Sequence, residues 1–369
     1  MTEASLPPWK RLLFSTVAMV GVPLAILALI EGASILILWQ RDYWHSGLPV
    51  PERRHRADYD TLLGWVNPSN FFHRDLFAPG VYLRINAQGF RDDHLIEPRV
   101  PPGRIRAVCS GDSFTFGFGV DNDHTWCALL ERKIRRLEAV NMGVSGYGAD
   151  QAYLRYKRDT RTLDHDLHIF AVIMADFQRM PLSEFVGAEK PVLRLDGDTL
   201  RLENVPVPSG SYRMRRLAPS LSKARQRIAQ LRTAVLIKRL RQRLSGHRVG
   251  FAKDSVLRQV AERVLVDLTK LSQTKNSQLV VLLLPTRNDW ADTTREDWRR
   301  MLNTAAERHG YLFVDLQDEF RRLPRDSFDL LFFAPHDVGG HYGDAGHQWV
   351  ADRLYQHLLA SPKMAPLLK

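Results

Sequence analysis

Cysteine is scarce in this sequence: among 369 residues there are two, Cys109 and Cys127. Two cysteines cannot build a disulfide framework, and their spacing matches no metal-ligand pattern. Cys109 ends an apolar run and Cys127 lies where a helix is expected, so we expect two buried thiols. A disulfide between them is the alternative, and it requires the two Cα atoms to lie close together. The sequence predicts no metal site and no cofactor.

Acidic residues are absent between Asn204 and Lys253, a segment with thirteen lysines and arginines. The formal net charge of +11 therefore belongs mainly to this segment. Residues 221–244 within it predict a basic amphipathic helix. Its arginine face is either simply solvated or attracted to anionic lipid. We expect no nucleic acid as partner, because no reading module and no stacking aromatics accompany the charges.

Charge is also absent from residues 12–30, which are nineteen in number, and an apolar run continues after Glu31 to Trp39. A helix rising 1.5 Å per residue needs about 20 residues to cross the roughly 30 Å apolar core of a membrane. No small-residue cleavage site is evident, so we predict an uncleaved transmembrane signal anchor over residues 12–39. Lys10 and Arg11 favour a cytoplasmic N-terminus (residues 1–11), although arginines after the segment weaken that charge asymmetry.

Apolar runs and helical patterns alternate from Arg104 onward, which favours a parallel sheet with crossover helices. A helix with Asn122 or Asp123 as its cap is expected after the first run, and a final helix carries Val350, Leu354 and Leu358 on one face. The expected fold is a three-layer α/β/α sandwich with a five-stranded, mainly parallel sheet. The expected strands are Ile105–Cys109, Ala139–Val144, Leu167–Met174, Leu279–Leu284 and Tyr311–Leu316.

An insertion over about residues 181–250 interrupts this pattern. Val192–Leu195 and Thr199–Leu202, joined around Asp196-Gly197-Asp198, predict a β-hairpin. The predicted organisation follows from these segments. It comprises residues 40–103 as a linker and flanking segment, 104–360 as the α/β domain, and 361–369 as a tail.

Ser113 stands where chemistry is expected in such a fold. Gly111-Asp112-Ser113 follows the first apolar run directly, and ligands of open α/β sheets bind outside the carboxyl ends of the strands. A serine in a turn more often caps a helix than reacts. A nucleophilic serine needs a base, usually a histidine that a carboxylate orients.

The histidine-rich stretch from His336 to His347 is the best source of that base. It follows an apolar run and immediately precedes the final helix, so it reaches the same sheet edge as Ser113. Residues 141–148, at the end of the second run, contain three glycines, including Gly146. Glycine lets a backbone N–H approach a ligand closely, which suits an oxyanion donor.

Together these motifs resemble the SGNH (GDSL-type) hydrolase superfamily, in particular its membrane-anchored bacterial members that face the periplasm. The resemblance rests on Gly111–Gly117 (GDSFTFG), on Asn141–Gln151 and on His341 with Gly346 behind it. It implies a flavodoxin-like fold, Ser113 as nucleophile, His341 as base, and the backbone N–H groups of Ser113 and Gly146 as the oxyanion hole. We take Asp337 as the acid that orients His341.

Two positions depart from that family's pattern. The third motif normally has an asparagine whose side chain donates to the oxyanion, whereas this chain has Ala175 followed by Asp176. The acid normally lies two or three residues before the histidine, whereas Asp337 lies four before it. Candidates for auxiliary roles are Asp112, which is more simply a brace of the turn, Asp176, Gln178 as a substitute donor, and Asp344 as a partner of His347.

The expected function is that of a serine esterase or O-acyltransferase that acts through an acyl-enzyme on Ser113. The resemblance implies an acylated, in particular acetylated, carbohydrate as the substrate, with a lipid ester as the alternative. It also implies an inner-membrane protein with one spanning helix and its catalytic domain in the periplasm. A protein of a different class is the second hypothesis: a catalytically degenerate relative that binds a glycan or a partner in an envelope assembly.

Overall fold

The structure is a computed structural model that describes residues 7, 9–10, 17–44, 57–185, 188–209, 254–290, 295–333 and 340–368, with backbone alone at residues 18, 35–44 and 254. The chain forms two compact units. Residues 1–48 and 214–250 form one unit, and residues 49–213 and 251–369 form the other.

The described part of the first unit is a short π-helix, η1 (Val17–Gly21), followed by α2 (Val22–Trp44). Apolar side chains here face solvent, with Met19 76% and Leu29 73% exposed. Within the described residues, no helix is both long enough and apolar enough to cross a membrane. The structure therefore does not show the predicted spanning helix over residues 12–39. The α-helix begins beside Pro23, because proline is tolerated in the first turn but not in a helix interior.

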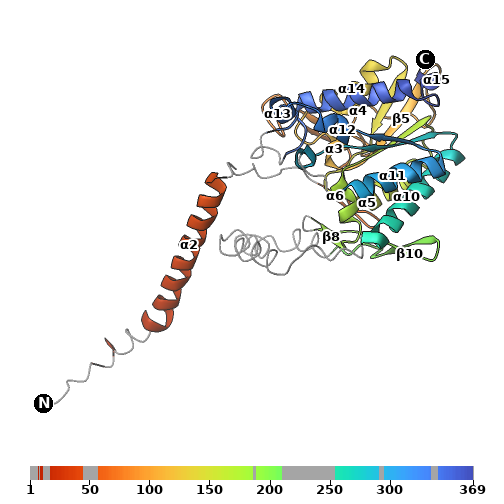
Figure 1. Cartoon of the computed structure of the whole chain (residues 1–369). Helices are drawn as coiled ribbons and strands as arrows, with labels where there is room; N and C mark the ends of the chain where they lie inside the picture. Colours follow the sequence, from red (N-terminus) through yellow and green to blue (C-terminus); the bar gives the residue numbers. More distant parts are fainter. Residues whose placement is uncertain are drawn as a thin grey trace. The chain divides into compact units, whose positions relative to one another are not determined.

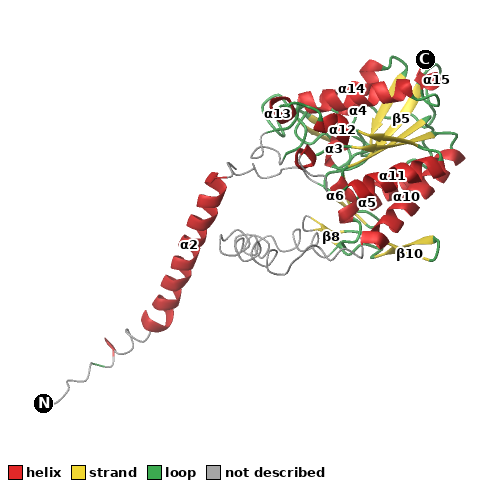
Figure 2. Ribbon diagram, in the orientation of Figure 1, coloured by secondary structure: helices red, strands yellow, loops and turns green. Residues whose placement is uncertain are grey.

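The second unit is built around a sheet that contains β5, with its strands drawn in yellow (Figure 2). The sheet has five strands in the order β13-β12-β7-β5-β6. All neighbouring strands pair in parallel, so the five predicted strands are confirmed and the sheet is entirely parallel. The chain moves from β5 to β6 on one side and then crosses to β7 on the other, which creates a switch point beside β5. The strands are β5 (Ile105–Ser110), β6 (Leu137–Asn141), β7 (Leu167–Val172), β12 (Gln278–Leu283) and β13 (Leu312–Asp315).

Helices cover both faces of the sheet and form the expected three layers (Figure 1). Alternate strand residues face opposite cores, as Val108 does on one side and Ala107 and Cys109 do on the other. One face packs against α5 (Ala149–Asp159), α10 (Asp254–Thr274) and α11 (Glu296–His309), and the other against α4 (Trp126–Lys133), α12 (Gln317–Arg321) and α14 (Asp344–Ala360).

The final helix is confirmed, because Val350, Leu354 and Leu358 of α14 are fully buried. The predicted cap of the helix after β5 is wrong. Asn122 lies in the 3-10 helix η2 (Asn122–His124), and the Thr125 hydroxyl caps α4 by accepting from Ala128 N–H at 3.3 Å. The sequence pattern could not separate the two short helices. Cys109 and Cys127 are free and buried, as expected.

Shorter elements complete the second unit. Those near the carboxyl edge of the sheet are α3 (Ser113–Phe116) and α6 (Met174–Arg179), and those after β12 are η3 (Arg287–Trp290), α13 (Arg325–Asp329) and α15 (Ala365–Leu368). Before β5 the chain forms two antiparallel pairs, β1 (Asp58–Asp60) with β2 (Gly64–Val66) and β3 (Phe71–His73) with β4 (Leu83–Ile85).

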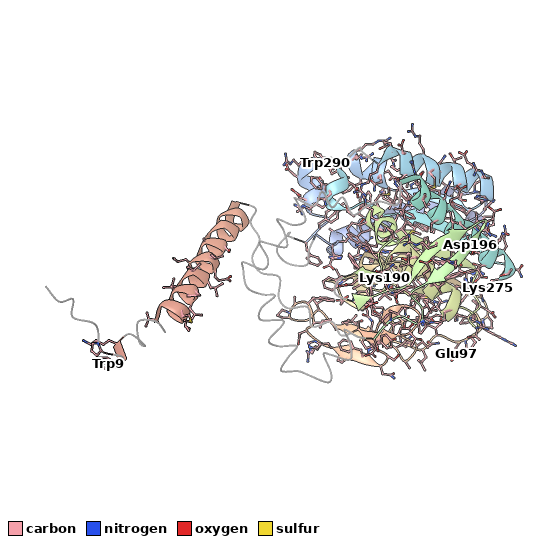
Figure 3. All side chains as sticks on the ribbon, turned by 90° about the horizontal axis from the view of Figure 1, so that it is seen from below. Trp9, Glu97, Lys190, Asp196, Lys275 and Trp290 are labelled. Atoms are coloured by element: carbon pink, nitrogen blue, oxygen red, sulfur yellow. The ribbon has the colours of Figure 1, made fainter. Side chains whose placement is uncertain are left out.

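The predicted hairpin of the insertion is confirmed as β10 (Val192–Asp196) and β11 (Thr199–Glu203), which pair antiparallel. It follows a smaller pair, β8 (Glu184–Phe185) and β9 (Ala188–Glu189). Lys190, labelled in Figure 3, anchors this part to α5, because its buried ammonium donates to the Asp150 carboxylate at 2.5 Å. The predicted basic helix over residues 221–244 lies outside the described residues.

Candidate active site

Ser113 is the first residue of α3, directly beyond the carboxyl end of β5. Gly111 makes this sharp turn possible, because a Cβ atom there would lie 2.3 Å from Thr115 Oγ1 and 2.4 Å from the Ala171 carbonyl oxygen. The Asp112 carboxylate caps α3 by accepting from Phe114 N–H at 2.8 Å. The bracing role expected of Asp112 is thus present. Ser113 N–H, at the start of the helix, has no acceptor inside it.

His341 lies beside Ser113, with 2.8 Å between its Nε2 atom and the serine Oγ. Tyr342 holds the position of this histidine: it is 1% exposed, and its hydroxyl donates to the Pro285 carbonyl. Two rings pack against the imidazole, those of Phe114 and Phe118, each with a centroid distance of 5.0 Å. The serine and histidine therefore have the geometry of a nucleophile and its base.

The loop after β6 packs tightly onto α3. A Cβ atom on Gly143 would lie 2.2 Å from Phe116 N, so only glycine fits at this approach. Gly146 has a φ angle of 84°. Its N–H has no acceptor within the described residues, which leaves it available to a ligand. Trp65, on β2, donates to the Ser145 carbonyl at 3.0 Å and so braces this loop from outside the sheet.

Two buried carboxyl groups lie beside Arg179, and one of them adjoins the serine. Asp112 and Asp176 are each 1% exposed, and Asp112 Oδ2 is 3.4 Å from Ser113 Oγ. Arg179 Nη1 donates to both, at 3.1 Å to Asp112 and 2.7 Å to Asp176. Burial, and secondly the charge of Asp112, raise the pKa of Asp176 well above its ordinary value. Burial alone would lower the pKa of Arg179, but the charges of Asp176 and Asp112 outweigh burial, so the pKa of Arg179 is raised.

Ala175, on α6, stands at the position where the family's pattern has an asparagine that donates to the oxyanion, and Gln178, on the same helix, is the candidate substitute donor. Ala175 is partly buried against the core on the α14 side and offers no polar atom. The Gln178 side-chain amide lies beside the guanidinium of Arg295, with 3.1 Å to Nη2 in the amide orientation in which its oxygen accepts. Asp176 closes the start of α6, because its Oδ2 accepts from Ile173 N–H at 3.0 Å.

The structure gives His347 a different partner from the predicted one. His347 is fully buried, and its Nδ1 accepts from Trp126 N–H at 3.2 Å, so it caps α4 from the neighbouring helix. Burial, then the charge of Arg91, lower its pKa to about 3. The Asp344 side chain is 70% exposed and lies 3.6 Å from His124. The Asp344–His347 pair is therefore wrong. Asp337 lies outside the described residues, so its role stays a prediction.

Sequence reasoning missed two residues that organise the site, Arg179 and Trp65. Arg179 follows Asp176 by three positions on a helix, a spacing at which side chains meet, and this was the available signal. Trp65 had no such signal, because its partner at Ser145 is 80 positions away in the chain.

When the five strands of the sheet are numbered in chain order and read from the β6 edge, they lie in the order 2-1-3-4-5. This order, with a serine–histidine pair beyond the first strand, defines the class as a hydrolase with a flavodoxin-like α/β fold. Residues 109–349 match the model of the GDSL-like lipase/acylhydrolase family, which is more than half of the chain. The chain belongs to that family. Among the curated proteins, none matches this chain.

Solved structures show only a distant likeness. A member of the lipolytic protein G-D-S-L family from Veillonella parvula has a TM-score of 0.40 and 13% identity over 68% of this chain and 97% of that one. The acetyl xylan esterase AlAXEase has a TM-score of 0.40 and 13% identity, and the match covers 68% of this chain and 98% of that one. A variant of Axe2, an acetyl-xylooligosaccharide esterase from Geobacillus, has a TM-score of 0.40 and 15% identity, and the match covers 70% of this chain and 96% of that one. Likenesses of this size say nothing about the substrate of this chain.

Proposed function

We propose that this protein is a serine-dependent ester hydrolase or O-acyltransferase that works through an acyl-enzyme on Ser113. The observation that carries the proposal is the 2.8 Å distance between Ser113 Oγ and His341 Nε2. Membership of the GDSL-like lipase/acylhydrolase family supports ester chemistry.

The proposed reaction has two halves. Ser113 Oγ attacks the ester carbonyl carbon while its proton passes to His341 Nε2, and the tetrahedral intermediate then expels the alcohol, which takes that proton. In the second half, water or a sugar hydroxyl gives its proton to His341 and attacks the acyl-enzyme. Collapse of the second intermediate frees Ser113, which recovers its proton from His341.

The negative oxygen of each intermediate needs donors in fixed positions. We assign this role to the N–H groups of Ser113 and Gly146. In other enzymes the loss of one such donor costs about 3 kcal/mol of transition-state stabilisation, so the absence of a polar side chain at Ala175 predicts a modest rate. We assign the orientation of His341 to Asp337.

We propose an acylated carbohydrate as the substrate, on the resemblance of the sequence motifs to those of periplasmic SGNH proteins. The proposed location follows the same resemblance, with residues 12–39 as a membrane anchor and the second unit in the periplasm. A reporter that works only in the periplasm, fused after Lys369, tests the location. Activity of only a cytosolic reporter would overturn it.

The activity is tested with a fluorophosphonate probe, which reacts covalently with activated serines. We expect labelling of the wild type and none of Ser113→Ala. Mass spectrometry after incubation with acetylated oligosaccharides should then find an acetyl group on the peptide that contains Ser113. Failure of the folded wild type to be labelled would instead favour the non-catalytic binding protein.

A further inference from the structure

Arg179 joins three separate segments of the site through one nitrogen atom. Its Nη1 donates to Asp112 Oδ2 at 3.1 Å, to the Tyr147 carbonyl oxygen at 2.7 Å and to Asp176 Oδ1 at 2.7 Å. These acceptors lie in the turn after β5, in the loop after β6 and in the helix after β7. Three consecutive strand ends of the sheet are thus tied together at one point.

Each of the first two acceptors adjoins an atom that the proposed reaction uses. Asp112 directly precedes Ser113, and its carboxylate also caps α3, so its position sets where α3 begins. Tyr147 directly follows Gly146, so the carbonyl that Arg179 holds is one residue from the proposed oxyanion donor. Arg179 therefore bridges the residue before the nucleophile and the residue after that donor.

The guanidinium is itself fixed in place. Its side chain is only 15% exposed, and its central carbon lies 4.8 Å from the ring centroid of Phe185 on β8. The short strand thus covers one face of the guanidinium. Its positive charge also stabilises the ionised forms of two carboxyl groups, Asp112 and Asp176, which burial would otherwise disfavour. Replacement by a neutral side chain would leave Asp112 and Asp176 facing one another without a cation.

We propose that Arg179 is a positioning residue for the reaction at Ser113, which holds the nucleophile turn and the Gly146 loop in register. The proposal rests on the function proposed above. In this role Arg179 acts through the residues that it holds. A misplacement of about 1 Å between reacting groups costs on the order of 100-fold in rate, so loss of this tie should lower turnover much more than substrate binding.

The test compares Arg179→Met and Arg179→Lys with a matched control, Arg299→Met. Arg299, on α11, is 12% exposed and pairs with the carboxylates of Glu296, Asp315 and Asp318. Like Arg179 it thus has three acceptors, which for Arg179 are two carboxyl groups and one carbonyl oxygen. Asp315 ends β13, which is three strands away from β5. The control therefore removes a similarly paired arginine far from Ser113.

Turnover of p-nitrophenyl acetate and the rate of fluorophosphonate labelling are the first readouts. We expect Arg179→Met to lower kcat and the labelling rate about 100-fold with KM within about threefold. Arg179→Lys should lose only about tenfold, because one ammonium can donate to the same three acceptors. Arg299→Met should keep wild-type rates below its own unfolding temperature. Unchanged kcat in both Arg179 variants would overturn the proposal, and so would an equal loss in Arg299→Met.

Hydrogen exchange is the second readout, and it does not depend on activity. We expect faster amide exchange in Arg179→Met over residues 111–117 and 143–148, but not over the strands of the sheet. Unchanged exchange in both segments would overturn the positioning role, even if the wild type proved unreactive and the proposed function failed. If Arg179→Met does not fold, both readouts are taken on Arg179→Lys, where wild-type kcat and wild-type exchange would together overturn the proposal.

Discussion

The Oγ atom of Ser110 lies 2.7 Å from Nε2 of His168, so the chain contains a second serine–histidine pair three residues before Ser113. Both residues are inside the sheet, with Ser110 1% and His168 0% exposed. The ring of Tyr156 stacks on the imidazole at a centroid distance of 3.5 Å. Distance alone therefore does not make a nucleophile, because no substrate reaches a serine that is covered in this way.

Substitution of the two serines should separate these roles. We expect Ser110→Ala to keep fluorophosphonate labelling, whereas Ser113→Ala loses it. Ser110→Ala leaves a buried ring nitrogen without its partner, which should lower the free energy of unfolding by about 1–3 kcal/mol. Probe labelling and urea denaturation of both variants give the answer. Loss of labelling in folded Ser110→Ala would contradict this assignment.

Substitution of the two histidines near the site should also have different effects. His341→Asn removes the base beside Ser113, and we expect kcat to fall by a factor of about 100 to 10,000. His347→Asn should keep near wild-type kcat, because an asparagine oxygen can still accept from Trp126 N–H. Steady-state turnover of p-nitrophenyl acetate tests both. A larger loss in His347→Asn than in His341→Asn would reverse the assignment of the base.

The acid that orients His341 can be identified with a matched pair of variants. We expect Asp337→Asn to lower kcat by about 100-fold or more, because a base without its carboxylate loses the correct tautomer and orientation. Asp344→Asn should change kcat less than twofold, because that side chain is 70% exposed and lies beside His124. The pH profile of kcat for both variants is the measurement. Equal activity of Asp337→Asn and wild type would exclude Asp337.

The buried state of His347 predicts how its substitution changes acid stability. Its pKa is lowered to about 3 by burial and secondly by Arg91, whereas an unfolded histidine titrates near 6.5. Between these values the unfolded state binds more protons, so the free energy of unfolding decreases as the pH falls. Between pH 7 and pH 5 this one group should lower the free energy of unfolding of the wild type by about 2 kcal/mol. His347→Asn lacks the group and should not show this decrease.

Urea denaturation of both proteins at pH 7 and pH 5 measures that difference directly. Other groups with shifted pKa values, such as Asp176 and His168, are present in both proteins and cancel in the comparison. Equal losses of stability between the two pH values would mean that His347 is protonated in the folded protein.

The local sequence determined the strands, the final helix and the turn at Ser113. Apolar runs of five to eight residues predict buried strands, and Gly-Asp-Ser after the first of them predicts a tight turn at the carboxyl edge. These features depend on neighbours in the chain, so a single sequence contains them. His341 was identified through the motif resemblance rather than through its spacing from Ser113, which is 228 positions.

The tertiary structure alone decided the roles of residues whose partners are distant in the chain. The capping of α4 by His347 bridges 221 positions, and the contact between Arg179 and Asp112 bridges 67. Such pairings depend on how layers of the fold pack, and a linear pattern does not specify that packing. Thus the sequence predicted a reactive serine on an α/β sheet. Only the folded chain revealed the covered pair of Ser110 and His168 and the arginine that ties three strand ends together.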